Sequence, residues 1–334
     1  MPDNPQNSSS RTPGVETGRA NGTGTSADSG WFALPDHAVL ALEGRDAVAF
    51  AQAQLMNDVV ALAEGGWHWT GWLTPKGRVV ALFALLRPAP DTVWLLVPDA
   101  DPSDLAERLR RFVFRSKLTL RVRTDLHVCG RFAPAGAVHA GDEGGTTTDG
   151  RNGRILALPD GGLVLDMSGD GGPRSLRISA ETAPPAPAAV ADWRRCDLIH
   201  GWPRLDATQR EQWTPQQLSL DRLRAFSVKK GCYPGQEIVA RTHFLGQAKR
   251  GLALVETDDA LQAGDTLRER DDTDAAVLGT VVCAEGLLAL AVLPLPQEAR
   301  DEVGGAIPPS PDTTRPALGG ASWRRVAMAG GLAR

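Results

Sequence analysis

The sequence has few of the features that mark membrane proteins or nucleic-acid-binding proteins. In its 334 residues, no apolar run approaches the ~18 residues that a membrane-spanning helix needs. The 36 Lys and Arg residues and 40 Asp and Glu residues give a formal net charge of −4, which supplies no overall field for holding a phosphate backbone. We therefore expect neither a membrane segment nor direct binding to nucleic acid.

Cysteine is scarce as well. The four cysteines lie far apart and form no CxxC pair, so neither a disulfide framework nor a zinc site is indicated, and a reducing cytoplasm fits best. The first 30 residues are rich in Ser, Gly, Asn, Thr and Pro and lack the apolar segment of a signal peptide. We interpret residues 1–30 as a disordered tail and predict a cytoplasmic protein.

Strand and helix patterns alternate from Trp31 to about residue 130, which is typical of an α+β unit with an antiparallel sheet. The predicted strands cover 37–44, 66–73, 78–87, 92–97 and 117–123. Helices are predicted over 45–59 and over 101–114, where an Asp cap and a Pro open the second one. The strands 66–73 and 78–87 form a predicted hairpin around the turn at 74–77.

The rest of the chain divides into a second lobe and a β module. Residues 133–187 are dense in Gly and Pro with two strand-like pieces, and a helix is predicted over 188–201, ending at Gly201. After residue 246, short apolar runs separated by Gly and Asp predict a small all-β module, with Trp323 in a last strand or a loose end. We place the lobes at roughly 31–130 and 131–245, and the module with a loose tail at 246–334.

The stretch KKGCYPGQE, residues 229–237, contains the only tyrosine of the chain, Tyr233, beside Cys232. Two flanking glycines imply a tight, exposed loop, and the two lysines before it favour a thiolate. From the residues alone, two interpretations stay open. Cys232 is either a reactive thiol or a small buried hydrophobe in a loop that ends a domain.

The longer segment KKGCYPGQEIVAR, 229–241, resembles the signature of the YgfZ family of folate-binding proteins, relatives of the aminomethyltransferase (T-protein) of the glycine cleavage system. Further matching segments follow in the order that the family has them, and together they span most of residues 37–255. They are 51–59, 74–87, 114–120, 201–231 and 247–255.

The resemblance implies a ring of two α+β lobes and a C-terminal β-barrel around a central channel that accepts a reduced folate. It also implies a role in assembling or maintaining iron–sulfur enzymes, including radical enzymes that modify tRNA. The expected cofactor is tetrahydrofolate or a one-carbon derivative, and the expected partners are iron–sulfur enzymes or cluster assembly factors. The link to tRNA would be indirect, because a direct binder needs a basic face.

Two departures from the family pattern bear on chemistry. Where the family tends to read Gln-Gly-Gln-x-Thr-Asn-Asp, the chain has Ala53 and Met56 within 52–58. Where aminomethyltransferases carry an Asp-Asp pair, it has Ala81 and Leu82. Aminomethyl transfer needs a carboxylate near the pterin nitrogens, so we expect a folate-binding protein without classical turnover. The alternative is a tetrahydrofolate-dependent one-carbon transferase.

The candidate site residues follow from the resemblance. Cys232 is the functional thiol, as a redox partner or a transient cluster ligand, since one thiol is too few for a stable cluster. The expected folate contacts are Asn57, Asp58, Lys230, Tyr233, Gln236 and Glu237. Tyr233 packs on the pterin or on a partner, or is a hydrophobic latch for the loop. Glu237 and Arg241 are four apart and favour an ion pair that fixes the loop.

For several other features the sequence leaves two interpretations open. The three indoles of the strand 66–73 either line the folate channel or belong to the core; they are those of Trp67, Trp69 and Trp72. His243 is either a base for Cys232 in a thiol hydrolase or a residue without a catalytic role. Seven basic residues between 108 and 123 meet a polyglutamate tail or an acidic partner, or form a solvated face. The remaining cysteines carry no motif and are expected in the core. They are Cys129, Cys196 and Cys283.

Overall fold

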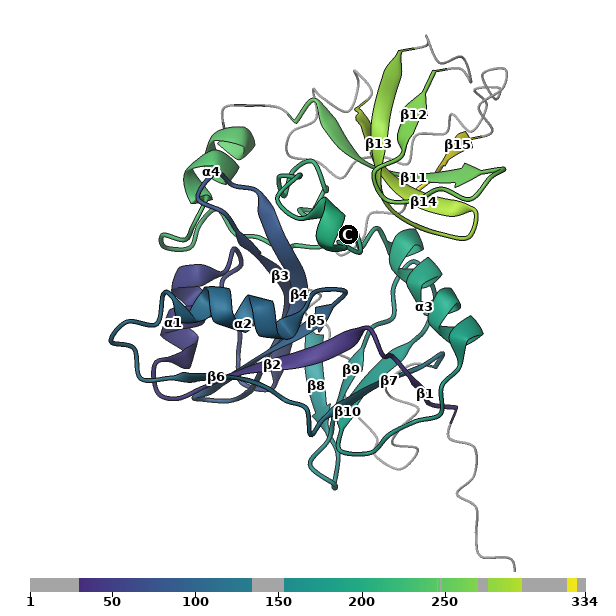
Figure 1. The fold of residues 1–334 in the computed structure, drawn as a ribbon. Coiled ribbons are helices and arrows are strands. Elements are labelled where there is room, and N and C mark those ends of the chain that lie inside the picture. Colours follow the sequence, from purple (N-terminus) through teal and green to yellow (C-terminus); the bar gives the residue numbers. More distant parts are fainter. Residues whose placement is uncertain are drawn as a thin grey trace, which may run out of the picture. The chain divides into compact units, whose positions relative to one another are not determined.

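The computed structural model describes residues 30–133, 153–244, 246, 248–269, 276–295 and 323–328. In these residues the chain consists mainly of strands, which form a ten-stranded and a five-stranded sheet in which every pair is antiparallel (Figure 1). The predicted α+β class with antiparallel pairing is confirmed. All but the last residue of the predicted tail lies outside the described residues.

The larger sheet runs in the order β1-β7-β10-β9-β8-β3-β4-β5-β2-β6. Its strands are β1 (Phe32–Ala33), β2 (His37–Glu43), β3 (Gly66–Leu73), β4 (Val79–Ala89), β5 (Thr92–Pro98), β6 (Thr119–Val122), β7 (His127–Arg131), β8 (Gly153–Ala157), β9 (Leu163–Asp166) and β10 (Ser175–Ser179). β1 and β7 come from the first predicted lobe and β7 pairs with β10 of the second. The sheet is therefore continuous across the lobe boundary that the sequence predicted at 131, and that boundary stays a prediction.

The β3–β4 hairpin forms as the sequence predicts. Gly77 takes a left-handed φ of 69° in the turn, and its N–H donates to the carbonyl of Thr74 at 2.9 Å. β3 is buried along its whole length. Because successive side chains of a strand point to opposite faces, Trp67 and Trp69 belong to one core cluster and Trp72 to another. All three indoles thus lie in the core, and their contact with a folate stays a prediction.

Four α-helices are found among the described residues: α1 (Ala47–Gln54), α2 (Pro102–Arg110), α3 (Pro187–His200) and α4 (Gln236–Phe244), with a 3₁₀ turn at Ala207–Gln209. Asp101 caps α2 through its carboxylate, which accepts from the N–H of Ser103 at 2.8 Å, and Pro102 opens the helix as predicted. α3 ends at Gly201, whose φ of 75° is the left-handed conformation expected there.

Two predicted helices are longer than the helices that form. α1 ends at Gln54, because Leu55 is extended and forms a bridge to Trp72. α2 ends at Arg110 rather than near 114, because the next residues close tight turns and Phe114 takes a φ of 40°. A left-handed residue cannot continue a right-handed helix.

The smaller sheet runs in the order β12-β13-β14-β11-β15. Its strands are β11 (Arg250–Thr257), β12 (Thr266–Arg268), β13 (Val277–Glu285), β14 (Leu288–Pro294) and β15 (Trp323–Val326). The short apolar runs predicted after residue 246 form β11 to β14, and Trp323 begins a strand rather than a loose end. Among the described residues, no helix combines the length and the apolar character needed to cross a membrane.

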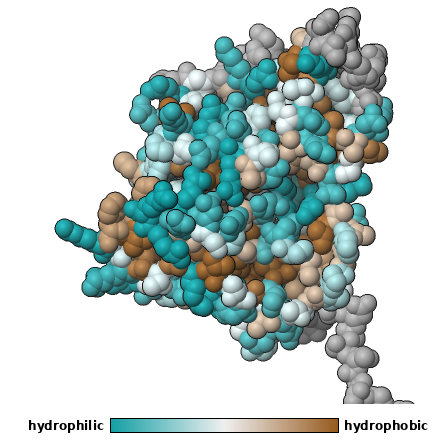
Figure 2. Space-filling view, in the orientation of Figure 1, coloured by the Kyte–Doolittle hydropathy of each residue, from teal (hydrophilic) through white to brown (hydrophobic). Residues whose placement is uncertain are grey.

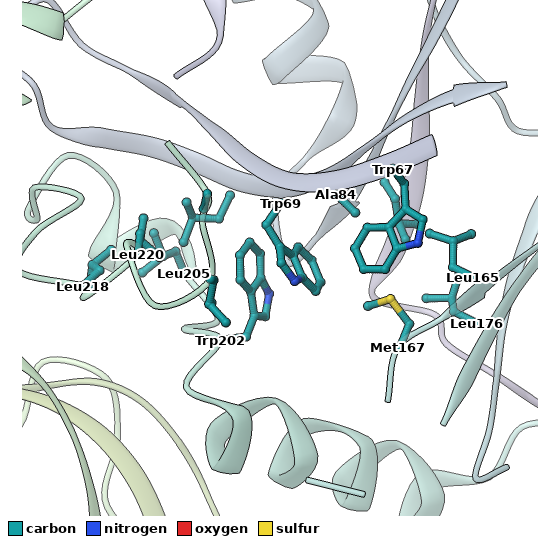
Figure 3. Packing of buried hydrophobic residues seen from close by; sticks show 14 of the residues in the cluster. Trp67, Trp69, Ala84, Leu165, Met167, Leu176, Trp202, Leu205, Leu218 and Leu220 are labelled. Carbon is teal, nitrogen blue, oxygen red and sulfur yellow. The ribbon is translucent and has the colours of Figure 1, made fainter. Parts of the chain in front are cut away.

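One core cluster draws on both sheets. It contains Trp67 and Trp69 of β3, Leu165 of β9, and Leu252 of β11 and Leu290 of β14 (Figure 3 shows part of it). Close contacts also join α3 to β13 and β14. The helix α3 and the segment after it are thus packed against strands from both sheets.

Candidate functional site

The loop 229–235 lies against the turn of the β3–β4 hairpin. Gly235 has a left-handed φ of 79°, and a Cβ atom placed on it would be 2.6 Å from the carbonyl oxygen of Thr74 and 2.7 Å from Cα of Gly77. No side chain fits in that space. Glycine at 235 therefore allows both the turn of the loop and its close approach to the hairpin.

Lys230 is buried, and its ammonium group fastens the loop to the end of α1. Nζ donates to the backbone carbonyls of Gln52 at 2.5 Å, Leu55 at 2.5 Å and Asn57 at 3.0 Å. Carbonyls at the end of a helix lack helical partners, and a cation there is favourable. Burial lowers the pKa of Lys230 to about 8, although the carboxylate of Asp58 raises it in part. The three protons of the ammonium group are all taken up by backbone oxygens.

Tyr233 is buried in the core cluster, and its contacts are those of a latch. Its hydroxyl donates to the carbonyl of Ser227 at 3.1 Å, and the ammonium of Lys230 lies 4.9 Å from the ring centroid. Burial raises the pKa of Tyr233 to about 12. The ring thus holds the loop from inside, and the alternative contact with a pterin stays a prediction.

Asn57 and Asp58 lie at the turn after α1, and their polar groups are occupied. The side-chain amide of Asn57 donates to the carbonyls of Trp69 and Arg224, both at 2.8 Å. The carboxylate of Asp58 accepts from the amide of Gln52 at 3.1 Å. These bonds brace the turn that Lys230 also holds.

The last two predicted folate contacts lie at the start of α4. Gln236 donates from its amide to the carbonyl of Lys230 at 3.2 Å. Glu237 is exposed and pairs with Arg241 at 2.7 Å, which confirms the expected ion pair. The structure thus brings Lys230, Tyr233 and Gln236 together as parts of one loop support, and it places Glu237 on the surface of α4.

Of the four cysteines, all of which the structure describes, only Cys232 is exposed. Cys129 and Cys283 are buried as expected, and burial raises the pKa of both thiols, that of Cys283 to about 12. Cys196, which was also expected in the core, is only half-buried, and burial raises its pKa too. A thiol with a raised pKa is a poor nucleophile and a poor metal ligand at neutral pH, so Cys232 is the thiol best placed to react.

The chemistry of a thiol hydrolase finds little support. The ring of His243 stacks edge-on against Phe244, with 4.9 Å between the ring centroids, on the exposed end of α4. Among the described residues, no group of three or more His, Cys, Asp and Glu side chains could hold a metal ion. The site is therefore a single exposed thiol on a firmly held loop.

His68 is a neighbour of this site that the sequence did not reveal. It lies on β3 with 6% of its surface exposed, and its Nε2 atom has no hydrogen-bond partner in the described part of the chain. Burial lowers the pKa of His68 to about 4. The negative charge of Asp58 raises this pKa in part, and the positive charge of Lys230 lowers it further. A lone histidine in a tryptophan-rich strand gives no signal that it will lie beside a motif lysine far along the chain.

The indoles of Trp69 and Trp202 stack in the core, with centroids 3.9 Å apart and planes 26° from parallel (Figure 3). Beside them is a cavity of about 10 Å³, whose lining includes Met167, Trp193 and the carboxylate residue Asp197. A water molecule needs about 10–15 Å³ of such space. The cavity is rich in aromatic surface but holds no more than about one water. A second cavity of about 150 Å³ lies between the segment 214–217, the end of α4 and the start of β11.

A buried ionic network crosses the chain near this cavity. Arg204 donates to both carboxylate oxygens of Asp99, to Asp36 at 2.7 Å and to Asp197 at 2.9 Å. Asp197 also pairs with Arg174 at 2.7 Å. Burial opposes the charge of Arg204, but its three carboxylate partners outweigh that effect and raise its pKa. The network joins the start of β2, the end of β5, α3 and β10.

Comparison with known proteins gives relatives along most of the chain, although no family model matches it. A protein of Cronobacter sakazakii named "tRNA-modifying protein YgfZ" is 30% identical over 231 residues, which are 66% of this chain and 69% of that protein. A protein of the same name from Aliivibrio fischeri is 28% identical over 273 residues, which are 78% of this chain and 84% of that protein. An uncharacterized protein of Haemophilus influenzae is 26% identical over 279 residues, which are 79% of this chain and 89% of that protein.

A solved structure shares the fold. The glycine cleavage system aminomethyltransferase T from Bartonella henselae superposes with a TM-score of 0.58 at 17% identity, over 79% of this chain and 78% of that one. At this level of identity the likeness concerns the fold alone. The chain therefore has the aminomethyltransferase type of fold, whatever chemistry its own residues support.

Proposed function

Because the chain belongs to the YgfZ family, we propose that it is a folate-binding accessory protein for the assembly or maintenance of iron–sulfur enzymes, with Cys232 as its functional thiol. The observation that carries this proposal is the exposure of Cys232 on a loop whose other residues are held in place. Support of tRNA modification would then be indirect, through enzymes that carry clusters. Its partners would be those enzymes or cluster assembly factors, in the cytoplasm.

The loop is built to present one sulfur atom. Lys230 and Tyr233 fix it from inside, and Gly235 lets it lie against the β3–β4 turn. Cys232 stays exposed among these anchored neighbours. A fixed backbone lowers the entropy lost when the thiol engages a partner.

The chemistry that suits this geometry is transient ligation. Sγ of Cys232 gives up its proton to solvent water and donates an electron pair to an iron atom of the cargo cluster. When the cargo leaves, the sulfur takes a proton back from solvent. No electron is gained or lost in that exchange. One thiol cannot hold a cluster alone, since clusters usually have about four protein ligands, so the sulfur would serve during transfer to or from a partner.

Folate binding is the second part of the proposal, and the fold likeness supports it. Flat aromatic side chains suit a pterin ring, and Trp69, Trp193 and Trp202 surround the cavity of about 10 Å³. That volume does not fit a pterin. Folate binding at this place therefore requires Trp202 to leave its stack on Trp69. We include in the same proposal that the two α+β lobes and the C-terminal β-barrel form a ring around a central folate channel.

Catalysis of one-carbon transfer is the alternative function. It is disfavoured because β4 has no carboxylate where aminomethyltransferases carry an Asp-Asp pair. Ala81 and Leu82 are both buried and pair with Trp72 and Gly71 of β3. Neither side chain can take a proton or stabilise a positive charge on a pterin nitrogen. The chain should therefore not replace an aminomethyltransferase in a reconstituted glycine cleavage assay.

The test of the proposed function compares Cys232→Ala with Cys196→Ala in a strain that lacks the protein. Activities of the iron–sulfur enzymes that methylthiolate tRNA should fall with Cys232→Ala and stay near wild type with Cys196→Ala. Folding and tetrahydrofolate affinity should hardly change in the first variant, because an exposed thiol-to-methyl change typically costs under about 0.5 kcal/mol. Full restoration of the enzyme activities by Cys232→Ala would refute the role of the thiol.

A further inference from the structure

The turn formed by residues 111–117, directly after α2, presents an aromatic side chain to solvent. Phe114 is 88% exposed, the largest fraction among the large hydrophobic residues in the described ranges, and Phe112 beside it is 41% exposed. The face shown in Figure 2 is mostly hydrophilic, with hydrophobic patches between the hydrophilic ones. A single exposed hydrophobic side chain is common on protein surfaces, so a function for Phe114 is inferred from its conformation and from the charges near it.

The backbone holds Phe114 in this position. The N–H groups of Phe112 and Val113 donate to the carbonyls of Leu109 and Arg110, and that of Ser116 donates to the carbonyl of Val113 at 2.8 Å. The N–H of Lys117 donates to the carboxylate of Asp46 at 2.6 Å. The ring is thus displayed on a closed turn rather than on a loose loop.

The backbone conformation of Phe114 is unfavourable for the residue it carries. Its φ of 40° lies in the left-handed region, which Gly and Asn adopt more readily than a bulky side chain. The fold needs a left-handed residue at this place but makes no use of the ring. Strained conformations of this kind gather at functional sites.

The charges around the ring are positive but are only partly neutralised. Arg108 pairs with Glu211 at 2.8 Å, and Arg111 lies 3.7 Å from Glu107. Arg115 and Lys117 are exposed, and within the described residues their side chains have no ion-pair partner. Two exposed cations therefore follow the ring in the chain, and no ion pair joins either of them to a carboxylate of the described residues.

We propose that the 111–117 turn is a docking surface for an acidic segment of a partner protein that also carries an apolar side chain. Phe114 would be the anchor that the partner buries, and Arg115 and Lys117 would pair with carboxylates of the same partner segment. Carboxylates of this chain, Glu107 and Glu211, lie among the cations. They would repel a continuous phosphate backbone, whereas a peptide can place its few charges between them, so the surface suits a protein segment better than a nucleic acid.

This inference goes beyond the proposed function and does not depend on folate or on Cys232. The probe is a fluorescein-labelled peptide in which Glu-Glu pairs alternate with Leu-Phe pairs, titrated with the full chain and followed by fluorescence anisotropy. Saturable binding should weaken at high NaCl, because exposed charges are screened there. A control peptide with Lys in place of Glu should not bind.

Three variants locate the binding surface. Phe114→Asn should weaken peptide binding about tenfold while the melting temperature stays the same or rises, because Asn tolerates the left-handed conformation. The double change Arg115→Glu and Lys117→Glu should abolish the salt dependence and weaken binding at least as much. Phe244→Ser, which removes another exposed ring, should leave binding unchanged.

Three results would each overturn the proposal: no saturable binding of the acidic peptide, equal binding by wild type and the Phe114→Asn variant, or tighter binding of a single-stranded oligonucleotide than of the peptide at the same salt. Tetrahydrofolate binding by each variant is measured alongside. Since it should not change, a failure of the docking surface is distinguishable from a failure of the proposed folate function.

Discussion

His68 should make the stability of the protein depend on pH in a window where few other groups titrate. The histidine is buried on β3, and burial lowers its pKa from 6.5 to about 4. In the unfolded chain it takes up a proton as the pH falls through about 6.5, whereas the folded chain resists until about 4. Between these values the unfolded state binds more protons, so the free energy of unfolding must fall as the pH falls.

The size of the effect follows from the shift. Each pKa unit corresponds to about 1.4 kcal/mol, so His68 alone should remove about 3 kcal/mol between pH 7.5 and pH 4. The pKa of His200 is lowered to about 4 as well, mainly by burial, and adds a similar loss. Replacing His68 by leucine should therefore roughly halve the pH dependence, and the contribution of His200 should remain.

Urea denaturation between about pH 7.5 and about pH 4.5, followed by tryptophan fluorescence, measures this dependence. His127 is exposed on β7, and His127→Gln is the matched control, whose curve should parallel that of wild type. If His68→Leu loses as much stability over this range as the wild type, then His68 is charged in the folded state or is not buried, and the reasoning fails.

Three further substitutions test the loop, the network and the stacked indoles. Gly235→Ala should lower the free energy of unfolding in urea by about 1–3 kcal/mol, because residue 235 has a left-handed φ and its added Cβ atom would lie 2.6 Å from the carbonyl oxygen of Thr74. The control Gly231→Ala, with nothing within 4 Å of the added carbon, should cost little. Equal losses in the two variants would contradict the packing argument. Arg204→Met should cost about 3–5 kcal/mol, since it leaves the carboxylate of Asp99 without its cation and removes one cation each from Asp36 and Asp197. Arg241→Met should cost under about 1 kcal/mol. Trp202→Ala should raise the affinity for tetrahydrofolate in a calorimetric titration, because the closed stack no longer has to open; a weaker affinity would show that the indole contacts the ligand instead.

The sequence predicted the elements whose causes are local. The end of α3 at Gly201, the cap of α2 at Asp101 and the ion pair of Glu237 and Arg241 all depend on residues within four positions of one another. The strand 66–73 was recognisable because its alternation of large and small residues matches the period of a strand. Local causes of this kind are readable without knowing the fold.

The site could be predicted only in outline. The motif pointed to Cys232 and its loop, but not to the partners of Lys230, which lie between 173 and 178 positions earlier in the chain. Similarly, nothing near Arg204 in sequence indicates that Asp36, 168 positions away, will accept a hydrogen bond from it. Such pairings are set by the register of the sheets and by the packing of α3, which spacing along the chain does not reveal.

The network around Arg204 has a consequence for how the protein is made. A nascent chain that has reached Asp99 already carries two of the carboxylates that Arg204 will bind, but the arginine itself emerges 105 positions later. Until then, the carboxylates of Asp36 and Asp99 would repel each other at the junction of β2 and β5, which opposes the backbone hydrogen bond from Asp99 to Asp36 that closes this end. Contacts of such long range are slow to form, and they appear late in synthesis. We therefore expect this corner of the sheet to stay open on the ribosome until α3 and the residues after it have left the exit tunnel.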